Sequence, residues 1–599
     1  MNASQSAVLT DEAREPSVPR ASPPCLPGED SPLLMHNDRG DGPEQRQLAG
    51  FPKNGVEDME AVRSMWTPKV LAAAYLGVLL VIFGNGLESQ ASSNLMPYAT
   101  SEFSEHALVS TVGISSSFIA GVARIPVAKL VDIWGRGEGF VVMVASATLG
   151  LALMAVCRNI AVYVIAQVFY AVGTDSANYI LHVFMADVST LRNRALAFGF
   201  ATTPYLLTAF AGPALAQWFQ KNSTWRWAYV TFAITTPLLA SPLAFLLLNT
   251  KRNAFKEGLI RRSHLQKAEP LKLWLQRLAV EFDVVGASLF VTGLALILIP
   301  LSLQSHYAGG LLDVTMISQC IAGLSSLLLF GAWESRYAPV PLIPYRVIMN
   351  RTVAGSCLLC FGCFVANGCY HTYFPSFLQV VHRLSIRDAG YIANISSITA
   401  CLCGVSIAWL IRQTGRFKPF GLLAQPIRAL GLLCMIPAVA RGPSVSTAVL
   451  VGCQFGIAIS GSMLVAANNT AVNAAVAKKD IAIVIAVLLL FSSVGNSVGT
   501  AVGGVVWSNS MPRLLREYLP DGKKHLALAI YGSLKKQLAF PDGSEERAAI
   551  VKAYCVTETR LCVYAALSVP FVIACVLMWR DVPVRDEMDG RAAESEHLD

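Results

Sequence analysis

Long apolar stretches, separated by short polar connections, recur along the chain from Trp66 to Trp579. About fourteen of them reach the roughly 20 residues that a helix needs to cross the hydrocarbon core of a bilayer. Because backbone in lipid must satisfy its own hydrogen bonds, this pattern predicts a bundle of transmembrane helices. We expect the spans at 68–92, 107–131, 138–157, 160–182, 195–219, 227–249, 284–304, 313–332, 353–378, 389–411, 418–440, 446–472, 481–507 and 558–579.

The connections differ in charge from one side of the predicted membrane to the other. If both termini are cytoplasmic, the short inner loops hold about 19 Lys and Arg and the short outer loops about 6, as the positive-inside rule requires. Charged residues are only 14% of the chain, against about 25% in soluble domains. The net charge of +8 therefore reflects topology and does not indicate a nucleic-acid partner.

The lengths of the connections divide the chain into parts. Residues 1–65 are proline-rich and lack apolar periodicity, so we expect a disordered cytoplasmic tail. The predicted order is a six-helix half at 66–250, a cytoplasmic linker at 251–283, helices 7–13 at 284–507, a long outer loop at 508–557, helix 14 at 558–580 and a cytoplasmic tail at 581–599.

Glycines recur at helical spacing in the thirteenth span, at Gly495, Gly499 and Gly503. Small residues four apart let two helix backbones approach closely within a membrane. We therefore expect this span to pack directly on a neighbouring helix.

The sequence AKLVDIWGRG at 128–137 follows the second predicted span. It resembles the major facilitator signature GxxxDxxGR[RK], with Ala128 in place of the first glycine and Gly137 in place of the last basic residue. The resemblance implies a major facilitator fold, built from two six-helix halves and here two extra helices. It also implies a gating role for Asp132, Gly135 and Arg136, in which Gly135 permits the tight turn between two packed spans.

A longer resemblance, to the fungal siderophore-iron transporters of the same superfamily, covers nearly everything from Trp66 to about Arg580. It implies import of a ferric siderophore chelate coupled to protons, and Tyr554 is our candidate for a substrate contact in the outer loop. The segments that carry it are NLMPYATSEFSEHAL at 94–108, RIPVAKLVDIWGRGEGF at 124–140, ADVSTLRNRALAFGF at 186–200, TWRW at 224–227, EFDVVG at 281–286, YHTYFPSFLQVV at 370–381, AGYI at 389–392, TGRFK at 414–418 and AYCVTETRL at 553–561.

An exporter of drugs or secondary metabolites in exchange for protons is the main alternative. The antiporter motif of span 4 has an arginine four residues before a glycine, and Phe169 stands at that position before Gly173. In span 5, Thr208, Ala216 and Gln217 interrupt the glycine series of the antiporters. These losses count against an antiporter without excluding it.

Other classes of membrane protein lack support in the sequence. No GxxxxGK[ST] motif occurs, so ATP is not the expected energy source, and no HExxH or histidine box indicates a metalloenzyme. Cys357, Cys360 and Cys363 share a helical face, but a thiolate metal site would be costly in lipid, so we interpret them as packing residues. We expect neither an enzyme nor a bound cofactor or metal, and find no large ligand domain of a receptor.

Polar side chains within the spans are costly unless they face a cavity or each other. An aromatic and amide surface would suit a large, mostly neutral ferric chelate without touching the iron. For the uncharged residues, hydrogen bonds between helices are the alternative. The substrate-cavity candidates are Asn85, Gln167, Tyr170, Asn178, Asn367, Tyr370 and His371, and the proton-coupling candidates are Glu88, Asp175 and Arg124.

Two short motifs bear on location. Glu29, Leu33 and Leu34 have the spacing of an acidic dileucine signal for a sorting adaptor, with a solvated linker as the alternative. Asn222 begins an Asn-Ser-Thr glycosylation sequon on the predicted outer side, close to the membrane. The plasma membrane and an endosomal or vacuolar membrane both remain open.

Overall fold

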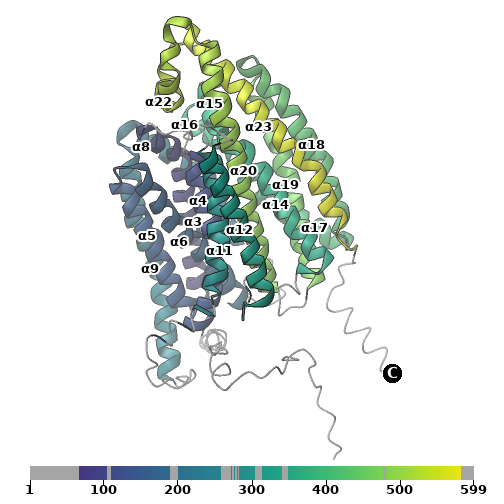
Figure 1. The fold of residues 1–599 in the computed structure, drawn as a ribbon. Helices are drawn as coiled ribbons and strands as arrows, with labels where there is room; N and C mark the ends of the chain where they lie inside the picture. The colour runs from purple at the N-terminus through teal and green to yellow at the C-terminus, as the bar shows by residue number, and fades with distance from the viewer. Residues whose placement is uncertain are drawn as a thin grey trace, which may run out of the picture. The chain divides into compact units, whose positions relative to one another are not determined.

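The computed structural model describes residues 66–103, 109–188, 200–257, 282–303, 313–339, 348–476 and 481–581, with a few single positions between them (Figure 1). Every element within these ranges is helical. The predicted tail 1–65 with Glu29, Leu33 and Leu34, most of the linker 251–283, and nearly all of 581–599 lie outside the described residues.

Among the described residues, six helices begin before the predicted linker and two follow it before the second half begins. The first six are α3 (Pro68–Glu102), α4 (Val109–Trp134), α5 (Arg136–Val156), α6 (Ile160–Val188), α8 (Pro204–Asn222) and α9 (Trp225–Lys256). The next two are α11 (Val284–Ser302) and α12 (Val314–Arg336).

The second half consists of α14 (Arg351–His371), α15 (Phe374–Val381), α16 (Ile386–Ala393), α17 (Ile395–Thr414), α18 (Lys418–Arg441), α19 (Thr447–Ala475), α20 (Ile481–Tyr518) and α23 (Glu545–Leu577). Between α20 and α23 lie the short helices η6 (Asp521–Leu526), α21 (Ala527–Tyr531) and α22 (Leu534–Ala539). The prediction of an all-α membrane protein is confirmed.

The number of spans comes close to the predicted number. Within the described ranges, 12 helices are long and apolar enough to cross a membrane, and the pair α16–α17, bent by 40°, makes a 13th. Helix α8 occupies the place of the fifth predicted span, but Gln217, Gln220 and Lys221 make its last turns too polar to meet the same criterion.

The predicted outer loop 508–557 is shorter in the structure. Helix α20 continues to Tyr518 and α23 already begins at Glu545, so the connection is 519–544. Ser544 caps α23 by accepting a hydrogen bond from the Arg547 amide at 3.2 Å. The boundary was misplaced because the hydrophobic pattern ends before the helices do.

The helices of each half pack in pairs, and a few helices join the halves. In the first half α5 packs on α6 and α9, and α3 packs on α8 and α9. In the second half α14 packs on α20 and α23, and α18 on α19 and α23. The halves meet where α4 packs on α20 and where α8 packs on α16 and α17. Helices α11 and α12 pack on one another, and α11 also contacts α4 and α20.

The close approach predicted from the glycines of the thirteenth span occurs between α14 and α20. A Cβ on Gly499 would overlap the carbonyl oxygen of Val365, and one on Gly503 would lie 2.9 Å from the carbonyl oxygen of Cys369. From the other side, a Cβ on Gly368 would lie 2.6 Å from the carbonyl oxygen of Asn496. The two backbones are therefore in direct contact along three turns.

We predict that Gly499→Ala destabilises the protein by about 1–3 kcal/mol, because the added methyl group meets rigid backbone. The thermal midpoint of the purified protein measures the effect. Gly461→Ala on α19 is the matched control, since a Cβ there meets nothing within 4 Å. Equal midpoints for the two variants would contradict the close packing of α14 and α20.

Candidate functional site

A polar cluster joins α3 and α6 within the first half. The Asn85 side-chain amide donates a hydrogen bond to Oδ1 of Asn178 at 3.0 Å. Nearer the α3 C-terminus, Glu88 is buried close to Tyr170 of α6. Because these α6 residues recur at helical spacing, they lie on the face of α6 that meets α3.

Two buried oxygen atoms of this region lack a hydrogen-bond partner among the described residues. They are Oε1 of Gln167 on α6 and Oε1 of Glu88 on α3. Buried polar atoms without a protein partner are uncommon and indicate a site for water or a ligand. The cluster thus has free acceptors in addition to the Asn85–Asn178 pair.

An ion pair connects this cluster to the second half. Arg124 of α4 pairs with Asp175 of α6, and its other terminal nitrogen donates to Oγ of Ser493 on α20 at 3.2 Å. The Arg124 side chain is 13% exposed and that of Asp175 38%. Arg124 therefore bridges three helices from both halves, with the more accessible end of the ion pair on Asp175.

The predicted residues of the second half lie on α14. Tyr370 is buried and its hydroxyl donates to Oε1 of Gln454 on α19 at 3.3 Å. His371 lies at hydrogen-bonding distance from the carbonyl oxygen of Ala393, at 3.3 Å, so its ring meets α16. Asn367 is half-buried one turn earlier. The rings of Tyr370 and His371 meet edge to face, with their centres 6.2 Å apart, but their polar atoms bond to different helices, α19 and α16.

Two residues of the second-half site were missed in the sequence. Gln454 is the partner of Tyr370, and Arg428 of α18 is a buried cation that donates to Sγ and the carbonyl oxygen of Cys363 at 3.3 and 3.2 Å. Each is a polar residue in the middle of an apolar span, and this can be recognised in the sequence as a candidate for a buried polar contact. Cys363 thus packs against a guanidinium, and no group of metal-ligand geometry occurs among the described His, Cys, Asp and Glu residues.

The signature motif forms a turn between α4 and α5. Gly135 has a φ of +106°, which glycine adopts at low cost. Arg136 donates from Nε to Asp187 of α6 at 3.0 Å, and Lys251 of α9 donates to the Trp134 carbonyl oxygen at 2.8 Å and pairs with Glu138 at 2.7 Å. Asp132 lies in the last turn of α4, and its side chain is outside the described set.

Tyr554 is not in a loop, contrary to the prediction. It belongs to α23 and is fully buried, where its hydroxyl donates to Oε1 of Gln537 at 2.6 Å and its ring packs on Trp507. A direct contact with a ligand would first require Gln537 to move. Asn222 is exposed at the end of α8, where its amide donates to the Trp218 carbonyl oxygen at 3.0 Å.

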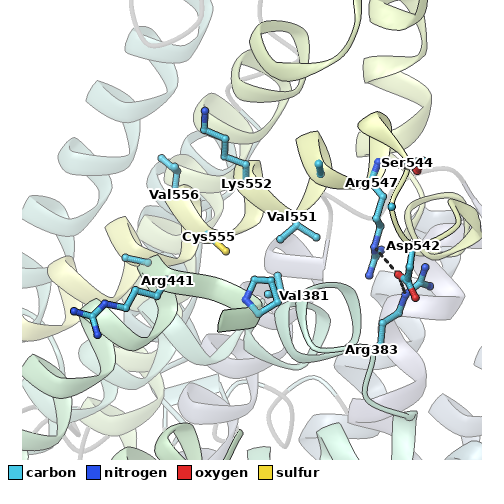
Figure 2. Close-up of a pocket in the computed structure, with 14 residues that line it drawn as sticks. Val381, Arg383, Arg441, Asp542, Ser544, Arg547, Val551, Lys552, Cys555 and Val556 are labelled. Atoms are coloured by element: carbon cyan, nitrogen blue, oxygen red, sulfur yellow. Dashed lines mark hydrogen bonds and ion pairs between the residues drawn. The ribbon is translucent and has the colours of Figure 1, made fainter. Parts of the chain in front are cut away.

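A cavity of about 600 Å³ lies at the ends of α15, α18 and α23 (Figure 2). Its walls include Val381, Val551 and Cys555, with Arg441 and Lys552 at one side. The Lys552 ammonium lies 4.1 Å from the ring centre of Tyr518. This cavity contains none of the predicted substrate residues, so it is distinct from the polar clusters of α3, α6 and α14.

The family model of the Major Facilitator Superfamily matches residues 78–500. "MFS siderochrome iron transporter 1" of Ajellomyces capsulatus is 36% identical over 92% of this chain and 94% of its own length. "Siderophore iron transporter mirB" of Emericella nidulans is 36% identical over 85% and 84%. The chain belongs to the siderophore iron transporter family of the major facilitator superfamily. The expected family is confirmed, and this member is a multi-pass membrane transporter and not an enzyme.

Solved structures agree with this family's fold. A bacterial homologue of the human lysosomal transporter Spinster has a TM-score of 0.55 at 16% identity, covering 86% of this chain and 98% of its own. The peptide transporter POT in complex with sulfate has a TM-score of 0.52 at 14% identity, covering 84% and 95%. Similarity at this level of identity supports the fold of the transporter alone.

We predict that Arg124 and Asp175 of this transporter are energetically coupled. Arg124→Met and Asp175→Asn should each lower the thermal midpoint, and the double variant should lose less than the sum. We expect a coupling energy near the lower end of about 0.5–3 kcal/mol, because Asp175 is partly exposed. Strictly additive losses would show that the two side chains act independently.

Proposed function

We propose that this chain imports ferric siderophore chelates by proton symport. The observation that carries the proposal is the extent of similarity to proteins named siderochrome or siderophore iron transporters. Relatives of this name from Ajellomyces, Aspergillus and Emericella are 34–36% identical over 85–96% of the chain. The polar residues buried between the helices provide the chemistry that such a substrate needs.

The chelate would bind between the halves by its organic groups. Amides and hydroxyls such as those of Asn85, Gln167 and Tyr170 can hydrogen-bond its carbonyl groups, while aromatic rings pack on its apolar backbone. Asn178 would add a further amide from α6, and Tyr370 would face the chelate from the second half, with Asn367 and His371 on α14 beside it. The iron remains enclosed by the chelate as cargo, so no protein ligand to it is required.

Proton coupling would use the carboxylates next to this proposed binding site between the halves. Asp175 is the stronger candidate, because it is the accessible member of an ion pair that joins both halves. Protonation of Asp175 would release Arg124 and weaken the connection from α6 to α20. Glu88 is a second candidate, since it is buried near Tyr170 and its Oε1 has no hydrogen-bond partner among the described residues. Rocking of the halves around the cavity would then alternate access to it.

The turn made by Gly135 and Arg136 would gate the inner end by holding α5, α6 and α9 together.

We further propose residence in the plasma membrane or an endosomal or vacuolar membrane, with Glu29, Leu33 and Leu34 recognised by a sorting adaptor. Attachment of a glycan at Asn222 fits its exposure, and a mobility shift lost in Asn222→Gln would test it.

We predict that cells without their own siderophore importers gain uptake of labelled ferric siderophore when they express this chain. A protonophore should abolish the uptake, because it removes the driving gradient. A panel of hydroxamate and catecholate chelates would define the substrate. Absence of uptake for every chelate, together with new drug resistance, would favour the alternative of a drug or secondary-metabolite:proton antiporter.

We predict that Asp175→Asn removes the dependence of uptake on external pH while leaving exchange of chelate across the membrane. The amide keeps the size of the side chain but binds no proton. Asp521→Asn is the matched control, since Asp521 lies outside the membrane helices and its hydrogen bond with Lys524 holds its pKa below the ordinary value. Unchanged pH dependence in Asp175→Asn would remove Asp175 as the coupling residue and direct attention to Glu88.

A further inference from the structure

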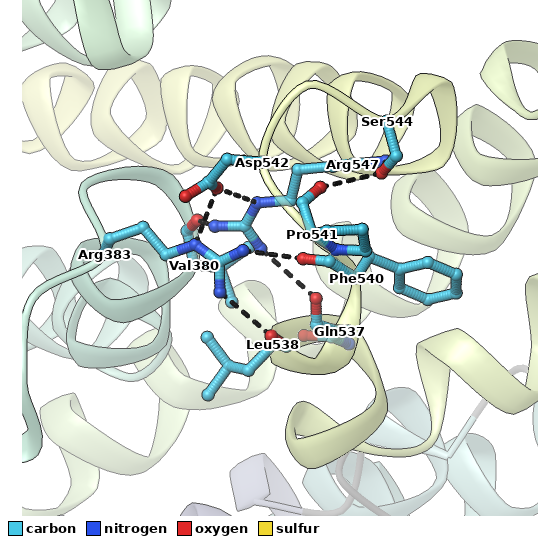
Figure 3. Close-up of polar contacts among 9 residues, drawn as sticks. All are labelled: Val380, Arg383, Gln537, Leu538, Phe540, Pro541, Asp542, Ser544 and Arg547. Carbon is cyan, nitrogen blue, oxygen red and sulfur yellow. Dashed lines mark hydrogen bonds and ion pairs between the residues drawn. The ribbon is translucent and has the colours of Figure 1, made fainter.

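The connection between α20 and α23, residues 519–544, forms a strap over the end of the bundle where α3 finishes and α23 begins. Arg383, at the end of α15, anchors it by donating to the carbonyl oxygens of Leu538 and Phe540 at 2.9 and 2.6 Å and to Asp542 at 2.9 Å (Figure 3). Arg547 of α23 donates to the Gln537 carbonyl oxygen at 3.2 Å. The strap is thus fixed to the second half by two arginines.

The strap also reaches the first half. The backbone N–H of Leu534 in α22 donates to Oγ of Ser101 in the last turn of α3 at 3.1 Å. Nearby, the Tyr98 hydroxyl of α3 donates to Oε1 of Gln379 in α15. Both contacts join the halves across the outer end, and both must break if the halves separate there.

Glu558 lies on α23 one helical turn beyond Tyr554, whose hydroxyl donates to Gln537 of the strap. Its side chain is fully buried, with 0% exposure. Neither carboxyl oxygen has a hydrogen-bond partner among the described residues. An ionised carboxylate without a partner or water is far more costly to bury than the neutral acid. In this closed arrangement Glu558 therefore holds a proton.

The groups around Glu558 provide no counter-charge that would replace that proton. Its neighbours on α14, on α23 itself and at the start of α15 are neutral phenols and thiols. The Arg428 guanidinium donates to Cys363 and Arg560 donates to Ser510 of α20, and neither pairs with Glu558. Burial lowers the pKa of His382 at the end of α15, so His382 is neutral except at low pH. The phenols and thiols are those of Tyr370, Tyr373, Tyr554, Cys555 and Cys562.

We propose that Glu558 is a proton-binding site that must be occupied for the outer end to close under the strap. Separation of the halves at Ser101 and Tyr98 would admit water to α23 and allow the carboxyl group to ionise. A proton taken up from the outer side onto a carboxyl oxygen then permits closure, with no other bond changed. Lower outer pH therefore favours the closed form. The inference deepens the proposed proton symport, on which it rests, by adding a site outside the Arg124–Asp175 pair.

Hydrogen exchange of the full chain in lipid nanodiscs tests this without any substrate. We expect peptides covering 527–540 to lose protection as pH rises, because ionisation of Glu558 opens the strap. Glu558→Gln, which stays neutral, should keep the strap protected across the same pH range. Glu545→Gln, an exposed position in the first turn of the same helix, is the matched control and should behave like the wild type.

The same pH response in the wild type and Glu558→Gln would overturn the proposal, as would a wild-type strap whose protection does not change with pH. Titration of His382 acts in the opposite direction, because its protonation adds charge at low pH, so the difference between the two proteins isolates Glu558. If Glu558→Gln does not fold, Glu558→Asp retains a carboxyl group and should keep the response. If cells show no chelate uptake but hydrogen exchange of the strap still responds to pH through Glu558, the proposed transport is rejected and the proton site is retained.

Discussion

A polar side chain inside this bundle must find its partner within the protein, because lipid offers none. This constraint determines which helices contact one another. Asn85 and Asn178 connect α3 to α6, Arg124 connects α4 to α6 and α20, and Tyr370 connects α14 to α19. Between α14 and α20, close packing of the two backbones at glycines adds a contact of a different kind. Where a buried carboxyl or amide oxygen has no partner among the described residues, as at Glu88, Gln167 and Glu558, a ligand or a proton can bind.

Much of the architecture could be predicted because a membrane reduces the choice of structure to helices of known length. The positions of the spans and the contact made by Gly495, Gly499 and Gly503 followed from hydrophobicity and spacing alone. The meeting of Asn85 with Asn178 did not follow, since spacing places residues on one face of a helix but does not select the helix opposite. The turn at Gly135 was predicted from the resemblance to the major facilitator signature. Its φ of +106° explains why the signature has a glycine there, since other residues rarely adopt this conformation.

The errors and omissions in the sequence-based interpretation share a physical origin. Tyr554 was taken as a loop residue because the apolar pattern begins after it, whereas α23 starts earlier and continues beyond the hydrophobic region. Arg428 and Gln454 are each visible as a single polar residue in an apolar span, but a single residue has no periodicity that would predict its partner. Glu558 was assigned to the edge of a span, and only packing under the strap reveals its complete burial. Burial depends on tertiary contacts that one sequence does not contain.

Helix α11 gives the bundle a mechanical asymmetry. Leu294 and Leu298 pack with Ile114 and Phe118 of α4 and with Ala501 of α20, so one helix is wedged along a joint between the halves. On the other joint, α8 faces the bent pair α16–α17, and Asn394 at the bend donates to the Ala209 carbonyl oxygen at 3.2 Å. One contact between the halves is thus reinforced by an additional helix, whereas the other depends on a bent pair of helices.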